Sequence, residues 1–161
     1  MDTIATDNSF SENPFSKMET EMLATMVGMI IPASTRYGVP SAADEIILSD
    51  IIDTARQTAD TIREGLTALD AAALNEHGAS FLSLDHDTRT TIIEKLDESS
   101  NRFLEDINRF TLQCYYRDTR VMMSLGMEAR PPFPIGYELE QGDWSLLDPV
   151  RDRGKIWRDN T

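Results

Sequence analysis

FLEDINRFTLQCYYRD, residues 103–118, is the stretch of sequence that decides the fold class. Its large apolar side chains recur three or four residues apart, which is the period of an amphipathic α-helix rather than of a strand. A helix over this stretch would begin after Ser99 or Ser100 and bury one face. We expect that buried face to consist of Phe103, Ile107, Phe110, Thr111 and Cys114.

Upstream of this stretch, a first helix is expected to begin at Ser16. Ser16 and Glu19 fit the S-x-x-E capping box, in which each side chain satisfies a free backbone N–H of the first turn. Pro32 is expected to end this helix. Its methionines recur at helical spacing and allow two interpretations, a core face with flexible side chains or an adaptable docking face for another protein. They are Met18, Met22, Met26 and Met29.

Three more helices are expected between these two. The second is predicted to be capped by Ser41, the third to begin within residues 58–61 and end at a Gly78 cap, and the fourth to follow Asp85 or Asp87. Each has apolar residues at helical spacing. The expected inward residues are Ile46, Ile47, Ile51 and Ile52 on the second helix, Ile62, Leu66, Leu69 and Ala73 on the third, and Ile92, Ile93 and Leu96 on the fourth.

These segments together predict an all-α fold. A short last helix is expected over residues 119–125, and no segment shows the sustained alternation that is typical of a strand. A chain of 161 residues suits a single domain. We therefore expect a compact bundle of about five to six helices over residues 16–125, preceded by a flexible arm over residues 1–15.

The tail over residues 126–161 has a different character. It holds four of the seven prolines and both tryptophans, without helical periodicity. Such long stretches are usually functional or disordered, and disordered tails avoid aromatic residues. We expect a long, irregular C-terminal arm that packs either on a partner protein or on its own bundle. Together with the two tyrosines at the end of the fifth helix, the expected partner-binding residues are Tyr115, Tyr116, Phe133, Tyr137, Trp144, Arg151 and Trp157.

Composition argues against several classes of function. The chain has 15 basic and 28 acidic residues, a formal net charge of −13, so phosphate backbones repel it and nucleic acid is not an expected partner. The longest apolar stretch, residues 26–31, is far shorter than the ~20 residues that span a bilayer, so direct membrane insertion is not expected either.

No catalytic, cofactor-binding or metal-binding arrangement stands out in the sequence. His77 and His86 lack a second histidine or a glutamate at helical ligand spacing, and both are interpreted as polar groups at helix ends. Cys114 lies on an apolar helix face, where a cysteine usually acts as a small hydrophobic residue. Motifs for phosphate, dinucleotide or nucleophilic serine chemistry are missing. We expect no catalytic residue, no cofactor and no metal in this chain.

The order of five segments carries a family resemblance. They are MLATMVGMIIPAS at 22–34, GVPSAADEIILSDIID at 38–53, IREGLTALDAAAL at 62–74, FLSLDHDTRTTIIEKL at 81–96 and FLEDINRFTLQCYYRD at 103–118. Over roughly residues 18–125 the chain resembles the gluconate 2-dehydrogenase subunit 3 family, the small (gamma) subunits of membrane-linked flavin dehydrogenases. The most telling pieces are IIP after the first helix and LQCYYRD at the end of the fifth.

The resemblance implies a non-catalytic subunit. It would bind and stabilise a large subunit of the glucose–methanol–choline oxidoreductase type, which carries FAD and oxidises a sugar, glucoside or sugar acid. A cytochrome c or another acceptor would take the electrons. The family implies an exported, periplasmic complex, but residues 1–15 lack a Tat or secretory signal, so the cytoplasm is the alternative. Two other functions stay open: an independent acidic helical chaperone or binding module for an unrelated protein, and an enzyme with an unrecognised site.

Overall fold

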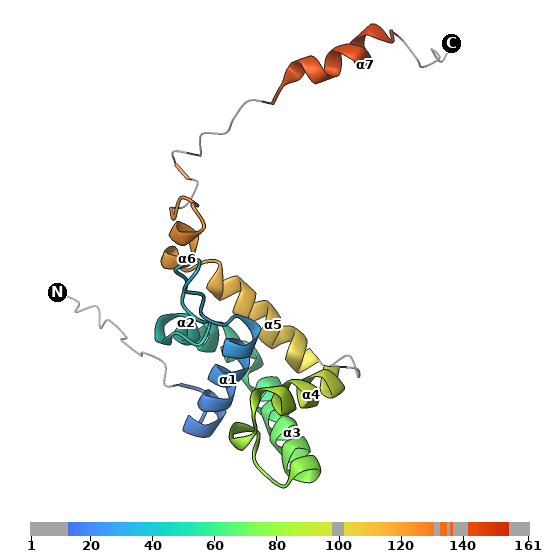
Figure 1. The fold of residues 1–161 in the computed structure, drawn as a ribbon. Helices are drawn as coiled ribbons and strands as arrows, with labels where there is room; N and C mark the ends of the chain where they lie inside the picture. The colour runs from blue at the N-terminus through green and yellow to red at the C-terminus, as the bar shows by residue number, and fades with distance from the viewer. Residues whose placement is uncertain (1–12, 98–101, 131–132, 135, 137–141, 155–161) are drawn as a thin grey trace, which may run out of the picture. The chain divides into compact units, whose positions relative to one another are not determined.

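The computed structural model describes residues 13–97, 102–130, 133–134, 136 and 142–154. Within these ranges the backbone forms helices and turns, with one isolated β-bridge between Ser34 and Val39 and no strand. The all-α prediction is confirmed (Figure 1). The chain divides into two compact units, the first ending at Ala129 and the second beginning at Arg130.

Helix α1, Lys17–Ile30, begins where the capping box predicts. The backbone N–H of Ser16 donates to Oε2 of Glu19 at 2.7 Å, and the N–H of Glu19 donates to Oγ of Ser16 at 3.3 Å. Ile31 is the C-terminal cap, one residue before Pro32. The reciprocal cap satisfies two N–H groups that the first turn leaves without helical partners.

Helix α2, Glu45–Ala55, begins later than predicted. Its cap is Asp44, whose carboxylate accepts from the N–H of Ile46 at 3.2 Å. The prediction that Ser41 caps this helix is wrong. The Ser41 hydroxyl lies in the preceding turn, where it donates to the Ile31 carbonyl and accepts from the N–H of Ala43. Ile46 is also wrong as a core residue. It is 60% exposed, since it lies about 100° around the helix from its buried neighbour Ile47.

Helices α3, Ala59–His77, and α4, His86–Asp97, agree with the sequence analysis. A short 3-10 helix, Arg56–Thr58, joins α2 to α3, and Gly78 ends α3 with a left-handed φ of 68°. A second 3-10 helix, Phe81–Ser83, inserts the Phe81 ring into the core before α4 begins. All four predicted inward residues of α3 are buried, whereas on α4 Ile92 is buried and Ile93 and Leu96 are partly buried.

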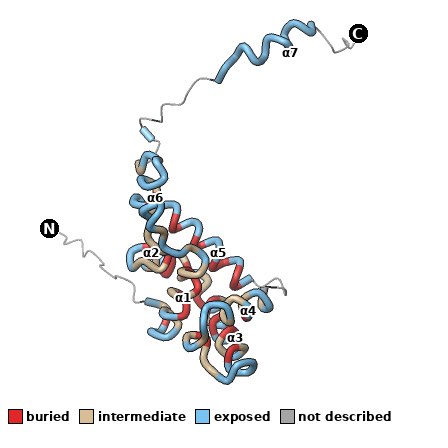
Figure 2. The backbone as a smooth tube through the Cα atoms, in the orientation of Figure 1, coloured by how far each residue is buried: buried red, intermediate tan, exposed pale blue. Residues whose placement is uncertain are grey.

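Helix α5, Arg102–Tyr115, is the central element of the first unit. It packs against α1, α2 and α3, and Figure 2 shows buried positions recurring along its length. The predicted buried face is confirmed at each of its five positions. Helix α6, Thr119–Ser124, follows it and is capped by the carboxylate of Asp118.

The second unit contains helical structure that the sequence analysis did not predict. A 3-10 helix, Trp144–Leu147, continues into α7, Asp148–Asp152. Asp143 caps the first of these, because its Oδ1 accepts from both the N–H and the hydroxyl of Ser145. Pro149 lies in the first turn of α7, where a missing N–H leaves no hydrogen bond unmade. The C-terminal arm is therefore not uniformly irregular.

Candidate partner-binding site

The described part of the arm presents apolar side chains to solvent. Phe133 is 84% exposed and Trp144 is 64% exposed, and Leu146, Leu147 and Val150 are exposed as well. These last three follow Trp144 on the same two short helices, so they form one apolar segment with it. We call residues 144–150 the arm segment.

Arg151 lies directly after the arm segment. Its guanidinium pairs with Asp148 one turn earlier, at 3.0 Å, and both side chains remain largely exposed. Exposed pairs of this kind contribute little to stability, so the arginine can exchange its partner on binding at small cost. The two other predicted residues of the arm, Tyr137 and Trp157, lie outside the described residues.

The tyrosine pair at the end of α5 divides into one buried and one exposed ring. Tyr115 is 3% exposed, and its hydroxyl donates to the Pro40 carbonyl at 3.0 Å. Burial raises the pKa of this phenol, with a smaller contribution from Tyr116 and Asp118. Tyr116 is 54% exposed, and its ring meets that of Tyr115 edge to face with centroids 5.3 Å apart. Tyr116 is thus the ring that a partner can reach, and Tyr115 supports it from the core.

Ion pairs hold α6 against the start of α2, next to this tyrosine pair. Arg120 donates to Asp44 at 2.6 Å and to Asp118 at 2.9 Å, so one guanidinium joins the N-terminal caps of both helices. Its hydrogen bonds hold the pKa of each carboxyl below the ordinary value. Arg117 adds a longer contact to Asp50, at 3.2 Å. The surface around Tyr116 is therefore built on a fixed junction.

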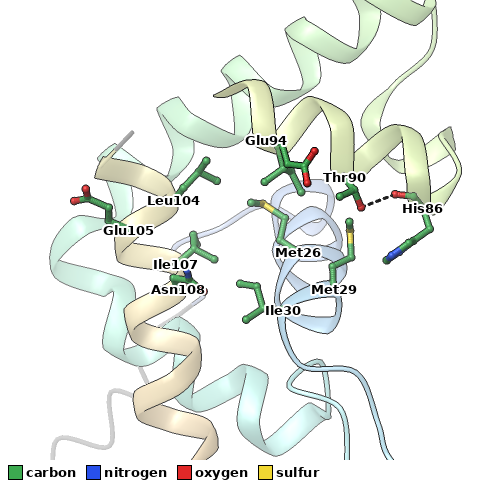
Figure 3. A pocket seen from close by; sticks show the side chains of 11 residues that line it. Met26, Met29, Ile30, His86, Thr90, Glu94, Leu104, Glu105, Ile107 and Asn108 are labelled. Carbon is green, nitrogen blue, oxygen red and sulfur yellow. Dashed lines mark hydrogen bonds between the residues drawn. The ribbon is translucent and has the colours of Figure 1, made fainter. Parts of the chain in front are cut away.

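A groove opens between α1, α4 and α5, and it is lined by none of the predicted partner-binding residues that the structure describes. Its volume is about 650 Å³. Figure 3 shows side chains of all three helices directed into it. Its apolar lining consists of Met26, Met29, Ile30, Ile93, Leu104 and Ile107. Its polar lining consists of His86, Thr90, Glu94, Glu105 and Asn108.

The methionine pattern of α1 was the one signal in the sequence for this groove. The core interpretation of that pattern is confirmed for Met22 and Met26, which are buried. Met26 and Met29 also line the groove, and the docking interpretation stays a prediction. Met18 is exposed. The groove itself depends on how three helices are spaced, which periodicity along a single helix does not report.

His77, His86 and Cys114 lie at separate places in the fold. His77 is the last residue of α3, 4.0 Å from Glu76, and His86 is the first of α4. Cys114 is buried, with Sγ 3.4 Å from the Thr54 hydroxyl. In the ranges that the structure describes, no three His, Cys, Asp or Glu side chains gather as a metal site would need. Among the same residues, no helix has the length and apolar character to cross a bilayer.

Comparison with known proteins identifies the family. Residues 17–128 match the family described as gluconate 2-dehydrogenase subunit 3. The match covers all of α1 to α6 and confirms the resemblance found in the sequence. Searches of curated proteins and of solved structures yield no match.

Proposed function

The chain belongs to the gluconate 2-dehydrogenase subunit 3 family, and from this premise we propose that it is a non-catalytic small subunit of a sugar dehydrogenase complex. It binds and stabilises a flavin-dependent large subunit of the glucose–methanol–choline type, in which FAD is bound. That subunit oxidises a sugar, glucoside or sugar acid. The complex passes the electrons to a cytochrome c or another acceptor, and works in the periplasm.

The exposed arm segment is the observation that carries the binding role. Trp144, Leu146 and Val150 are each more than half exposed, although they are large apolar side chains that water solvates poorly. A contiguous apolar surface of this kind usually marks a protein-binding site. Tryptophan and arginine are also among the residues that most often dominate binding energy, and Arg151 directly follows the arm segment.

The arm segment is also organised before binding. Asp143 caps its first turn and Pro149 fixes the backbone at the start of α7, so little backbone freedom remains to be lost when it docks. A partner that binds only the folded large subunit stabilises that subunit by mass action. A folded small subunit with a preformed docking segment therefore suits a stabilising role.

Co-purification tests the proposal. A tagged copy of this chain is co-expressed with the large subunit, captured and analysed for protein ratio and flavin absorbance. We expect a yellow complex, a colourless isolated chain, and less soluble large subunit when this chain is left out. Separate elution of the two chains would contradict the proposal, as would stoichiometric flavin on the isolated small subunit.

A further inference from the structure

The groove between α1, α4 and α5 differs from a typical small-molecule site. Such sites combine an apolar lining with several polar groups that converge on the ligand. Here the Thr90 hydroxyl already donates to the His86 carbonyl of its own helix, at 2.9 Å. Glu94 and Glu105 are exposed and lie at the rim (Figure 3), and His86 and Asn108 are exposed as well. The groove has few inward polar groups to orient a small molecule.

The floor of the groove suits apolar protein side chains. Met26, Leu104 and Ile107 are at most 9% exposed, so the core fixes their positions. Met29 and Ile93 are only partly buried and complete the walls. Methionine has three rotatable bonds and a polarisable sulfur, so such walls adapt to side chains of different shape. The groove can therefore hold the apolar side chains of a protein segment.

The charge at the rim favours a basic flank on that segment. Glu94 and Glu105 line the groove, and within the described residues neither forms an ion pair. Two neighbouring cations are paired elsewhere, since Lys95 pairs with Glu76 at 2.6 Å and Arg109 pairs with Asp106 at 2.6 Å. Complementary charge at a rim raises the association rate and selects among partners.

We propose that this groove is a second docking site for the large subunit, and that it binds an apolar segment flanked by lysine or arginine. The proposal rests on the proposed function and adds to it the location and chemistry of a contact other than the arm segment. Apolar side chains of the partner lie on Met26, Leu104 and Ile107. The basic flank lies next to Glu94 and Glu105.

Filling the groove tests the site directly. Asn108→Trp adds a large side chain at an exposed groove position without removing a core residue, and Asn75→Trp makes the same substitution at an exposed position of α3 that does not line the groove. Binding of each purified variant to the purified large subunit is measured by biolayer interferometry. We expect Asn108→Trp to raise Kd at least about tenfold, because a bulky side chain in the groove excludes the partner segment, and Asn75→Trp to stay within about twofold.

Charge reversal tests the basic flank, and also the groove if Asn108→Trp fails to fold. Glu94→Lys is compared with Glu64→Lys, an exposed residue of α3 that does not line the groove. Both variants change the net charge equally. We expect Glu94→Lys to slow association several-fold at low salt and much less at high salt, because salt screens exposed charges. Glu64→Lys should have the smaller effect under both conditions.

The outcomes separate the two proposals. If the wild-type chain binds the large subunit but Asn108→Trp and Glu94→Lys bind as their controls do, the groove is not a docking site and the proposed function stands. If the wild-type chain does not bind the large subunit at all, the proposed function is wrong and this inference is overturned with it.

Discussion

The aromatic ring of Phe103 on α5 occupies the space directly above Gly65 on α3, where any other residue would place its Cβ. Both residues are buried, and their contact sets how closely the two helices approach. Glycine within a helix costs about 0.5–1 kcal/mol relative to alanine. The close approach of the ring is the physical reason for a glycine at this position.

Gly65→Ala should therefore destabilise the chain despite its better helix propensity. The added methyl group would collide with the Phe103 ring, and overpacking costs about 1–3 kcal/mol. We expect a net loss of about 1–2 kcal/mol in the free energy of unfolding after the propensity gain is subtracted. Thermal unfolding followed by circular dichroism should show a Tm lower by several degrees.

Gly28→Ala is the matched control within a helix. There the added Cβ would meet the Ala43 Cβ at 3.3 Å, a far milder contact. We expect a smaller change in Tm than for Gly65→Ala. A Gly65→Ala protein that melts at or above the wild-type temperature would show that the ring does not rest on Gly65.

Local signals account for most of what the sequence could predict. The Ser16–Glu19 capping box lies within a single turn, and the buried face of α5 is a periodicity within one helix. Both need no knowledge of the rest of the chain. The start of α2 could not be predicted from local sequence alone, because Ser41 and Asp44 are both residue types that cap helices well. The hydrogen bond from Ser41 to the Ile31 carbonyl leaves Asp44 as the cap.

Features that depend on the packing of several helices could not be predicted from the sequence. The groove exists because α4 packs on α3 while α1 and α5 pack on each other and on α3, an arrangement that periodicity does not report. Ile46 sits in an apolar run and is exposed only because the register of α2 places Ile47 inward. The arm helices could have been predicted, since Asp143 lies two residues before Ser145 and Pro149 suits a first turn.

Acid should weaken the junction between α2 and α6. Hydrogen bonds from Arg120 lower the pKa of Asp44 and Asp118 below the ordinary 3.8 in the folded chain. A lowered folded-state pKa gives stability that is present above the unfolded pKa and is lost as pH falls through the folded value. Urea unfolding at a series of pH values should therefore show the free energy of unfolding decreasing below about pH 4.

Arg120→Gln should reduce the part of this pH dependence that comes from the two caps. Without the guanidinium the two carboxyl pKa values move back toward those of the unfolded chain, so less stability is lost on acidification. Arg151→Gln is the control, because its ion pair with Asp148 belongs to the second unit. An identical pH profile for wild type and Arg120→Gln would contradict this role of Arg120.

The thiol of Cys114 should report on opening of the core. It is the single cysteine of the chain and is 1% exposed on the inner face of α5. We expect Ellman's reagent to react slowly with the native chain and at once in strong denaturant, because a thiol reacts only when it is accessible as thiolate. Rapid reaction of the native chain, at the rate of a free thiol, would show that this face of α5 is not closed.

Removing residues 140–161 should affect partner binding and leave the bundle stable. Each described member of the hydrophobic core lies between Phe15 and Val121, so the deletion takes no core side chain from it. We expect helix content to fall only by the short arm helices and the Tm of the lone chain to stay nearly unchanged. Co-purification with the large subunit should fall sharply, which is measured by the protein ratio after capture.

Trp144→Ala tests whether a single side chain of the arm segment carries much of the binding to the large subunit. Truncating a central aromatic residue of an interface costs about 2 kcal/mol or more, which corresponds to about a 30-fold rise in Kd. Leu74→Ala, at an exposed apolar residue on α3, is the control for the general loss of apolar surface.

A chain without residues 140–161 that melts early and still captures the large subunit at the normal ratio would contradict the truncation prediction, because the arm would then belong to the chain's own core. The partner contact would then have to lie on the bundle, where Tyr116 and the groove of α1, α4 and α5 are the surfaces to test next.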